Sequence, residues 1–300
     1  MADSQTKNIR KVALTSLAGT SIEWYDFFLY GTAAAIIFPK AFFPSDMPAM
    51  VALIASFSTF AVGFLARPLG GIIFGHFGDR VGRKQTLVLA LLIMGTSTTL
   101  IGLLPTYATI GYIAPLILVL LRFVQGLAIG GQWGGAMLLV TESAPSDKRG
   151  WYGAYAQAGA PIGVILANLA FLGVSGGMSE DAFLDWGWRL PFLASIVLIG
   201  VSLYVQLNLE DTEAFKKLAN NQSEKSIEDT PSRRSPIVEV IVNYPKRIFL
   251  AAGAFLSIQV TFYILIAFIM AYGVNSPSVM LSRDTMLTAV LVAAMLMVPA

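Results

Sequence analysis

The sequence predicts an all-α, polytopic membrane protein, and three observations predict this fold class. Hydrophobic residues make up 56% of the 300 residues and charged residues only 13%, against about 45–50% and about 25% in soluble domains. The mean hydropathy is +0.69. The apolar residues gather in long runs, and a helix needs about 20 such residues to cross a bilayer. Disorder is excluded as well, because disordered chains are poor in apolar residues.

The apolar runs predict seven complete spans and an eighth that continues to the last residue. The complete spans are predicted at residues 12–38, 49–74, 86–104, 111–140, 151–174, 190–209 and 248–273. The eighth begins near Met286, and about fifteen residues barely cross a bilayer. The last segment is therefore either re-entrant or cut short, and we expect the chain to be a fragment of a longer protein.

The Lys and Arg residues are distributed unevenly between the two sides of the predicted membrane. Fifteen of the 20 fall in the N-terminal segment and in the loops after the second, fourth and sixth spans, whereas three fall in the other loops. Because cytoplasmic loops carry the excess of basic residues, we expect a multi-pass protein of the cell (inner) membrane with its N-terminus in the cytoplasm. The scattered basic residues also argue against a nucleic-acid partner.

One long polar segment separates the predicted spans into two groups. Residues 210–247 contain seven acidic and seven basic side chains, a balance that disfavours lipid binding by a basic cluster. We interpret this segment as a cytoplasmic linker between a six-helix bundle, residues 1–209, and the start of a second bundle, residues 248–300. Six spans, a linker and further spans are typical of transporters built from two repeated halves.

Charged residues inside the spans are candidates for function, because each costs about 2.5–3.5 kcal/mol near the bilayer centre. Glu23 and Asp26 lie in the first span, and Arg122 lies at a similar depth in the fourth. We predict that these three residues couple transport to protons. The alternative is that a buried ion pair only ties helices together. Arg67 is a weaker candidate, because it lies nearer to a span end, from which an arginine side chain can extend to the interface.

Polar residues at helical spacing form stripes on several predicted spans. Because three helices of the first bundle each carry such a stripe, we expect one aqueous cavity that binds the substrate. Besides Arg122, its predicted residues in the first bundle are Tyr30, Gln125, Gln132, Gln157 and Asn168. In the seventh span, Gln259 and Tyr263 share a face and are expected to line the cavity from the second half.

Three glycines recur every four residues in the fourth span, beside the stripe of Arg122. They are Gly126, Gly130 and Gly134. Small residues at this spacing let helix backbones approach closely, so we predict a packing role for them.

The segment between the second and third spans has a distinctive pattern. Residues 75–84 read Gly-His-Phe-Gly-Asp-Arg-Val-Gly-Arg-Lys. Glycines permit a tight turn, and the carboxylate is placed to meet a helix N-terminus or an arginine. We predict a conformational gate that latches two bundles together on the cytoplasmic side. The predicted gate residues are Gly75, Asp79, Arg80, Gly82, Arg83 and Lys84.

This segment resembles the signature loop of the major facilitator superfamily, and residues 122–126, Arg-Phe-Val-Gln-Gly, resemble the superfamily's fourth-span motif, whose arginine is associated with proton coupling. Three further stretches are similar to the metabolite:proton symporter family, namely residues 23–31, 130–136 and 185–192. The resemblance, over residues 17–215, implies a helical bundle of twelve spans that imports proline, betaine, shikimate, 2-oxoglutarate, citrate or related acids with protons. Gln132 stands where family members often have a glutamate.

These observations together predict a secondary active transporter that imports a small organic acid or zwitterion with protons by alternating access. We expect the proton as coupling ion and no metal or other cofactor, because the chain has no cysteine and a single histidine. The expected partners are the substrate and the lipid bilayer, and the protein is expected to be a monomer. Uniport or export of an amphipathic compound on the same fold is the alternative.

One short pattern suggests a different class of function. Residues 173–177 read Gly-Val-Ser-Gly-Gly and match the G-x-S-x-G pattern of serine hydrolases. The predicted topology places this serine on the outer side and His76 on the cytoplasmic side, so no Ser/His pair can form. We therefore predict that the protein is not an enzyme.

Overall fold

The computed structural model describes residues 2–81, 83–145, 147–207, 243–276 and 278–297. Some side chains within these ranges, including those of residues 78–84 and 131–143, lie outside the description. Helices occupy almost all of the described residues, which contain no strand. The predicted all-α fold class is therefore confirmed.

Long helices correspond to the first six predicted spans. They are α1 (Ala2–Ile36), α3 (Ala49–Val81), α4 (Arg83–Leu103), α6 (Ile113–Ser143), α7 (Arg149–Ser175) and α9 (Arg189–Leu207). Shorter helical segments lie between them, namely α2 (Phe38–Ala41), α5 (Tyr107–Ile110), α8 (Glu180–Ala182) and the π-helical η1 (Phe183–Gly187). The start of α1 and the end of α3 extend past the predicted limits, because hydropathy marks the apolar part of a helix and not its polar ends.

Fewer of the described helices can cross a bilayer by themselves than the sequence predicts. Four stretches are long and apolar enough, namely Ala49–Phe77, Ile113–Gly130, Arg149–Ser175 and Pro245–Asn275. The pair Glu180–Gly187 and Arg189–Val201, bent by 50°, would make a fifth. The apolar part of α4, Val88–Leu103, is shorter, and α1 is less apolar because it contains three acidic and three basic residues. The prediction of seven complete spans is thus only partly met.

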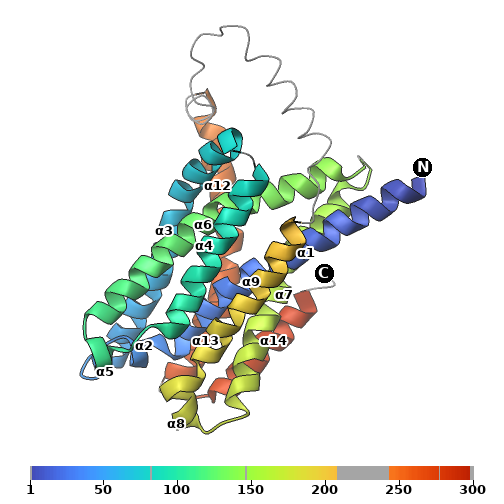
Figure 1. Ribbon diagram of the computed structural model, residues 1–300. Helices are drawn as coiled ribbons and strands as arrows, with labels where there is room; N and C mark the ends of the chain where they lie inside the picture. The colour runs from blue at the N-terminus through green and yellow to red at the C-terminus, as the bar shows by residue number, and fades with distance from the viewer. Residues whose placement is uncertain (1, 82, 146, 208–242, 277, 298–300) are drawn as a thin grey trace. The chain divides into compact units, whose positions relative to one another are not determined.

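Residues Met1–Glu210 and Met270–Ala300 form one compact unit. Within it, α1 packs along α7, α3 packs along α6, and α4 packs against both α6 and α9 (Figure 1). Helix α14 (Arg283–Met297), which follows α13 (Ile269–Asn275), packs on α7. Helices from both ends of the chain therefore meet on α7.

Glycines allow α3 and α6 to approach closely. A Cβ atom added at Gly126 would collide with the carbonyl oxygen of Gly63, and one added at Gly130 would collide with the carbonyl oxygen of Arg67. Backbone contact of this kind is typical of small residues repeated every four positions. The predicted packing role is confirmed for Gly126 and Gly130, while Gly134 lies outside the described side chains.

Glycines also bring α7 close to α1. A Cβ atom at Gly159 would collide with the side chain of Thr20, and one at Gly163 would lie 2.5 Å from the Cβ atom of Trp24. Helix α7 therefore covers the side of α1 that carries Thr20 and Trp24. Asp26 of α1 faces side chains of α4, α6 and α9 instead.

Asp211–Ile269 forms a second compact unit, in which helix α12 (Pro245–Tyr263) and the π-helical segment η2 (Ile264–Phe268) are described. The predicted seventh span is thus interrupted, because the helix changes from α to π geometry at Ile264. Short π-helical segments inside α-helices are frequent at functional sites. Most of the predicted linker, residues 210–247, lies outside the described residues, so its boundaries stay predictions.

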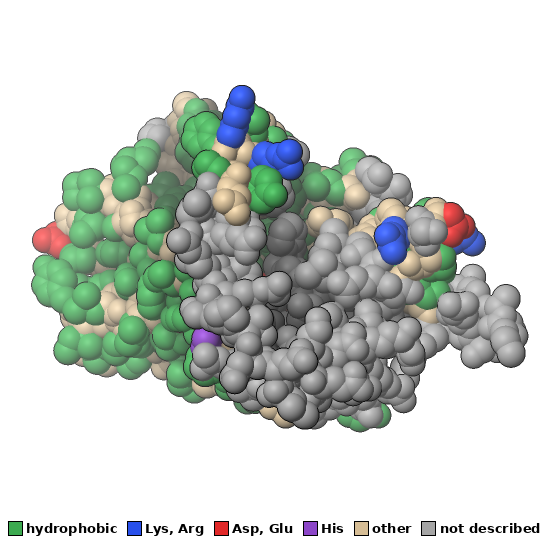
Figure 2. Space-filling view, turned by 90° about the horizontal axis from the view of Figure 1, so that it is seen from above, with side chains coloured by type: hydrophobic (Ala, Val, Ile, Leu, Met, Phe, Trp, Pro, Cys, Tyr) green, Lys and Arg blue, Asp and Glu red, His purple; other side chains and the backbone are tan. Residues whose placement is uncertain are grey.

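Hydrophobic side chains cover much of the described surface. Figure 2 shows them over most of the visible described part, with few Lys, Arg, Asp or Glu side chains among them. Leu65 on α3, Leu116 on α6 and Ile196 on α9 are 75%, 67% and 61% exposed. Apolar surface on this scale marks contact with a membrane or another protein, and the length of the helices indicates the membrane.

We expect Gly130→Ala to lower the melting temperature of the protein in detergent, because the new methyl group would push α6 away from the Arg67 carbonyl. The matched control is Gly200→Ala in α9, where a Cβ atom meets nothing within 4 Å and alanine favours the helix by about 1 kcal/mol. Thermal unfolding followed by circular dichroism measures both variants. Equal melting temperatures would contradict the packing role of Gly130.

Candidate functional site

Asp26 on α1 is completely buried. The side chains of Thr98 on α4 and Ser195 on α9 lie beside its carboxyl group, and Arg122 on α6 lies within electrostatic range. Neither carboxylate oxygen has a hydrogen bond of good geometry within the described residues. An ionised carboxylate in such surroundings is costly unless a positive charge compensates it. Arg122 is therefore the natural counter-charge of Asp26.

Arg122 lies in a cage of aromatic rings. Its side chain is completely buried, and its guanidinium carbon lies 4.3, 4.7 and 4.9 Å from the ring centroids of Tyr30, Phe60 and Phe27. Gly63 leaves room for it, since a Cβ atom there would lie 2.7 Å from Nε. A desolvated cation over an aromatic face gains about 2 kcal/mol. The cage thus stabilises a positive charge inside the bundle.

A chain of hydrogen bonds orients Arg122. Its Nη1 donates to Oε1 of Gln125 at 2.6 Å, and Nε2 of Gln125 donates to Oγ1 of Thr98 at 2.7 Å. Thr98 donates in turn to the carbonyl oxygen of Met94 at 3.0 Å. Both ends of the Gln125 amide are engaged, so this predicted substrate ligand holds Arg122 in the described conformation.

Tyr30 is anchored to α3 by its hydroxyl group. The hydroxyl lies 2.7 Å from Oγ1 of Thr59, which donates to the carbonyl oxygen of Ser56 at 2.7 Å. Ser56 donates to the carbonyl oxygen of Ala34 on α1, also at 2.7 Å. These bonds join α1 to α3 and fix the ring of Tyr30 against Arg122.

Arg67 is a second guanidinium inside the bundle, which the sequence reasoning named only as a weaker candidate. Its guanidinium carbon lies 4.6 and 4.7 Å from the ring centroids of Phe27 and Phe64, its Nε is buried, and Glu23 lies within electrostatic range. The side chain of Arg67 therefore packs among the aromatic rings of the bundle. Because α3 continues to Val81, seven residues past the predicted span, Arg67 lies well inside the helix.

Glu23 completes the charged group on α1. It is 7% exposed, and both Arg67 and Asp26 act on it electrostatically. The structure thus brings together all three predicted coupling residues, Glu23, Asp26 and Arg122, and adds Arg67 to them. Two acids and two bases occupy one region of the first compact unit.

The other residues predicted to line the cavity differ in burial, and one of them lies outside the described side chains. Asn168 on α7 is buried, its Nδ2 donates to the carbonyl oxygen four residues earlier at 2.9 Å, and its Oδ1 has no hydrogen bond among the described residues. Gln157 on the same helix is exposed. Gln132 lies outside the described side chains. Gln259 and Tyr263 belong to the second compact unit, so their place in the cavity stays a prediction.

The predicted gate segment is helical over most of its length. Helix α3 continues to Val81 and α4 begins at Arg83, so residues 75–81 do not form the expected turn. Glycine lowers helix propensity by about 1 kcal/mol, which packing in a bundle overrides. Gly75 is exposed. The side chains of the other predicted gate residues, Asp79, Arg80, Gly82, Arg83 and Lys84, lie outside the description, so the latch stays a prediction.

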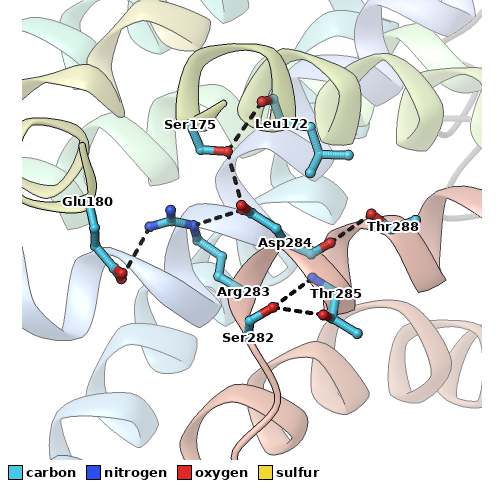
Figure 3. A network of polar contacts seen from close by, with 8 residues as sticks. All are labelled: Leu172, Ser175, Glu180, Ser282, Arg283, Asp284, Thr285 and Thr288. Atoms are coloured by element: carbon cyan, nitrogen blue, oxygen red, sulfur yellow. Dashed lines mark hydrogen bonds and ion pairs between the residues drawn. The ribbon is translucent and has the colours of Figure 1, made fainter. Parts of the chain in front are cut away.

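A separate network of polar contacts joins the end of α7 to the start of α14 (Figure 3). Ser175 Oγ donates to Oδ1 of Asp284 at 3.2 Å, and Arg283 Nε lies 3.5 Å from the same oxygen. Nη1 of Arg283 lies 3.8 Å from Oε1 of Glu180, and its guanidinium carbon lies 4.2 Å from the ring centroid of Phe183. These contacts connect residues about a hundred positions apart in the sequence.

The same network accounts for the serine of the hydrolase-like pattern. Ser175 bonds to Asp284 and to the carbonyl oxygen of Leu172, whereas His76 is exposed and its ring contacts Phe77. Within the described residues, Ser175 therefore has no histidine base, which a serine nucleophile requires.

Comparison with protein families identifies transporters. Residues 11–298 match the family described as "Sugar (and other) transporter". The xylose transporter XylE from E. coli, in a partially occluded inward-open conformation, superimposes with a TM-score of 0.66 over 97% of this chain and 71% of that one. Its sequence is 15% identical, so this likeness concerns the fold alone.

Two curated relatives from Escherichia coli (strain K12) are much more similar in sequence. The inner membrane metabolite transport protein YhjE is 47% identical over 263 residues, which are 88% of this chain and 58% of that protein. The shikimate transporter is 44% identical over 274 residues, which are 89% of this chain and 59% of that protein. The chain thus spans about three-fifths of the length of these relatives.

We expect Gln125→Glu to lower the melting temperature in detergent less than Gln125→Leu does, because the carboxylate still accepts a charge-assisted bond from Arg122, while the bond that the amide donates to Thr98 is lost. Gln125→Leu should lower it, since buried polar groups left without a hydrogen bond cost about 1–3 kcal/mol each. Thermal unfolding of the two variants beside the unmodified chain measures both. A leucine variant as stable as the glutamate variant would show that this chain of bonds does not hold Arg122.

Proposed function

Because the chain belongs to the sugar (and other) transporter family of the major facilitator superfamily, we propose that it forms part of a proton-coupled importer of a small organic acid or zwitterion. One observation carries the proposal: two carboxylates, Glu23 and Asp26, lie with Arg67 and Arg122 inside an apolar bundle. Ionisable residues inside a membrane are costly and mark proton or substrate pathways. Because the members of this family are transporters, the match disfavours the alternative that the protein is a serine hydrolase.

In the proposed cycle, Asp26 takes the proton. While Asp26 is ionised, the guanidinium of Arg122 balances its charge. When Asp26 is protonated, that balance is lost, and the site gains one net positive charge. A substrate carboxylate restores the balance, so proton and substrate bind together because uncompensated charge is costly in a site of low dielectric.

Alternating access is proposed to open and close the contacts between the two halves. The uneven distribution of Lys and Arg supports a cytoplasmic N-terminus, which places the end of α7 and the start of α14 on the outer side. There Ser175 meets Asp284, and Asn275 Nδ2 donates to the carbonyl oxygen of Ala35 at 3.4 Å. We propose that these contacts close the outer side and separate when the halves rock about the site.

The proposed substrate carries a carboxylate. The planar guanidinium of arginine matches the geometry of a carboxylate and forms two parallel hydrogen bonds with it. The shikimate transporter, 44% identical to this chain, supports the same class by its name. The proton is the proposed coupling ion, and the proposed functional unit is a monomer.

We expect proteoliposomes to accumulate one solute of a radiolabelled panel (proline, betaine, shikimate, 2-oxoglutarate and citrate) only under an inward proton gradient. The protein is tested as this chain and in a version extended to the length of its relatives. Asp26→Asn and Glu23→Gln are expected to abolish gradient-driven accumulation while the protein still folds, because an amide at position 26 cannot take the proton and one at position 23 leaves Arg67 without its counter-charge. Arg122→Lys should retain more activity than Arg122→Ala.

The control for this experiment is Lys40→Gln, because Lys40 is exposed and lies outside the charged group. It is expected to transport like the unmodified protein. Accumulation at the unmodified level by both carboxyl variants would overturn the coupling assignment. Equilibration of the solute without a response to the gradient would indicate uniport instead.

We expect a short thiol crosslink between α7 and α14 to stop uptake. The chain has no cysteine, so Ser175→Cys combined with Asp284→Cys gives a unique pair. A cleavable crosslinker should abolish uptake, and cleavage should restore it, because the outer side can no longer open. Ser175→Cys alone, treated in the same way, should stay active. Unchanged uptake at complete crosslinking would show that these helices do not separate during transport.

A further inference from the structure

The side chains of Arg122 and Arg67, the two arginines of the bundle, differ in their exposure. Arg122 is completely buried behind the rings of Tyr30 and Phe60, and it is bonded to Gln125. Arg67 is only partly buried. Arg67 is thus the more accessible of the two guanidinium groups.

Arg67 and Arg122 lie beside the same aromatic ring. Their guanidinium carbons are 4.6 and 4.9 Å from the ring centroid of Phe27. Two cations beside one ring repel each other where water is scarce, and nearby anions lower this repulsion. Among the described residues, Glu23 interacts electrostatically with Arg67, and Asp26 interacts electrostatically with Arg122. The four charged groups therefore form two pairs of opposite charge.

From this arrangement we propose that Arg67 binds the carboxylate of the substrate, whereas Arg122 remains inside the bundle as the counter-charge of Asp26. This inference rests on the proposed transport function. It assigns to Arg67 the contact that the sequence pattern predicts for Arg122. Glu23 and the substrate carboxylate then compete for the same guanidinium, which links substrate binding to the charge on Glu23.

The surroundings of Arg67 suit a carboxylate ligand. The rings of Phe27 and Phe64 lie 4.6 and 4.7 Å from its guanidinium carbon, so aromatic side chains hold the planar group by its faces. Its buried Nε donates to no acceptor among the described residues. A guanidinium stacked in this way presents its N–H edges, which bind a carboxylate through two parallel hydrogen bonds.

Both ends of Arg67 are held in position. Its carbonyl oxygen lies against Gly130, where even a methyl group would collide, so the backbone cannot shift toward α6. The two phenylalanine rings fix the other end of the side chain. A binding group that is already ordered loses little conformational entropy when the ligand arrives.

The first test compares uptake by two variants. Arg67→Gln is expected to raise the substrate concentration for half-maximal uptake at least about tenfold, because charge-assisted hydrogen bonds to the carboxylate are lost. The maximal rate should change less. Arg67→Lys should be intermediate, because lysine supplies a point charge without the planar fork. A merely structural role would lower the maximal rate and the melting temperature together.

The second test uses thiol labelling in a chain that has no cysteine of its own. The Arg67→Cys variant is expected to react with a positively charged methanethiosulfonate, and the substrate identified by uptake should slow the reaction. The added charge should partly restore uptake, whereas a neutral reagent of similar size should not. Arg122→Cys should stay unlabelled in the folded protein. Arg149→Cys, exposed at the start of α7, should be labelled equally with and without substrate.

The outcomes separate this inference from the proposed function. Failure of the unmodified, extended protein to take up any solute of the panel would overturn the proposed function. Uptake by that protein together with unchanged half-saturation in Arg67→Gln would overturn the assignment of Arg67 alone. Labelling of Arg67→Cys that the substrate does not slow would do the same. Should Arg67→Gln fail to fold, Arg67→Lys and the labelling decide.

Discussion

The arrangement of the first compact unit depends on balancing charge where water is scarce. Arg122 and Asp26 are completely buried, and burying either one alone would be very costly. Gly63 leaves room for the side chain of Arg122, and Gly126 and Gly130 let α6 lie against the backbone of α3. A larger residue at position 63 would therefore occupy the space that the guanidinium of Arg122 fills.

Sequence patterns correctly predicted the features that depend on neighbouring residues in the chain. The helical class and the helices of the spans followed from apolar runs, and Glu23, Asp26 and Arg122 were found because a charge in an apolar run is conspicuous. The family relationship predicted from short motifs is confirmed by the match over residues 11–298. Hydropathy predicted more spans than the described helices that are long and apolar enough to cross a bilayer by themselves.

Features that depend on tertiary contact could not be predicted in this way. The surroundings of Arg67 could not be predicted, because the place of a residue in its helix depends on where the helix ends, and α3 continues past the apolar run. Gln125 has the polarity of a substrate ligand, but only the fold shows that its amide lies between Arg122 and Thr98. The contact of Ser175 with Asp284 joins segments 109 residues apart, and no local pattern contains such information.

The two charged groups of the chain differ in a way that suits their proposed tasks. Around Arg283, the partners Glu180 and Asp284 are 73% and 54% exposed, and exposed ion pairs contribute only about 0–1 kcal/mol. Such contacts can break and form again in every transport cycle. Arg122 must instead stay buried while the charge of Asp26 changes. The rings of Tyr30, Phe27 and Phe60 make this possible, because an aromatic face stabilises a cation without binding a proton or competing for a carboxylate. Charge can therefore change on the acid while the base keeps its place.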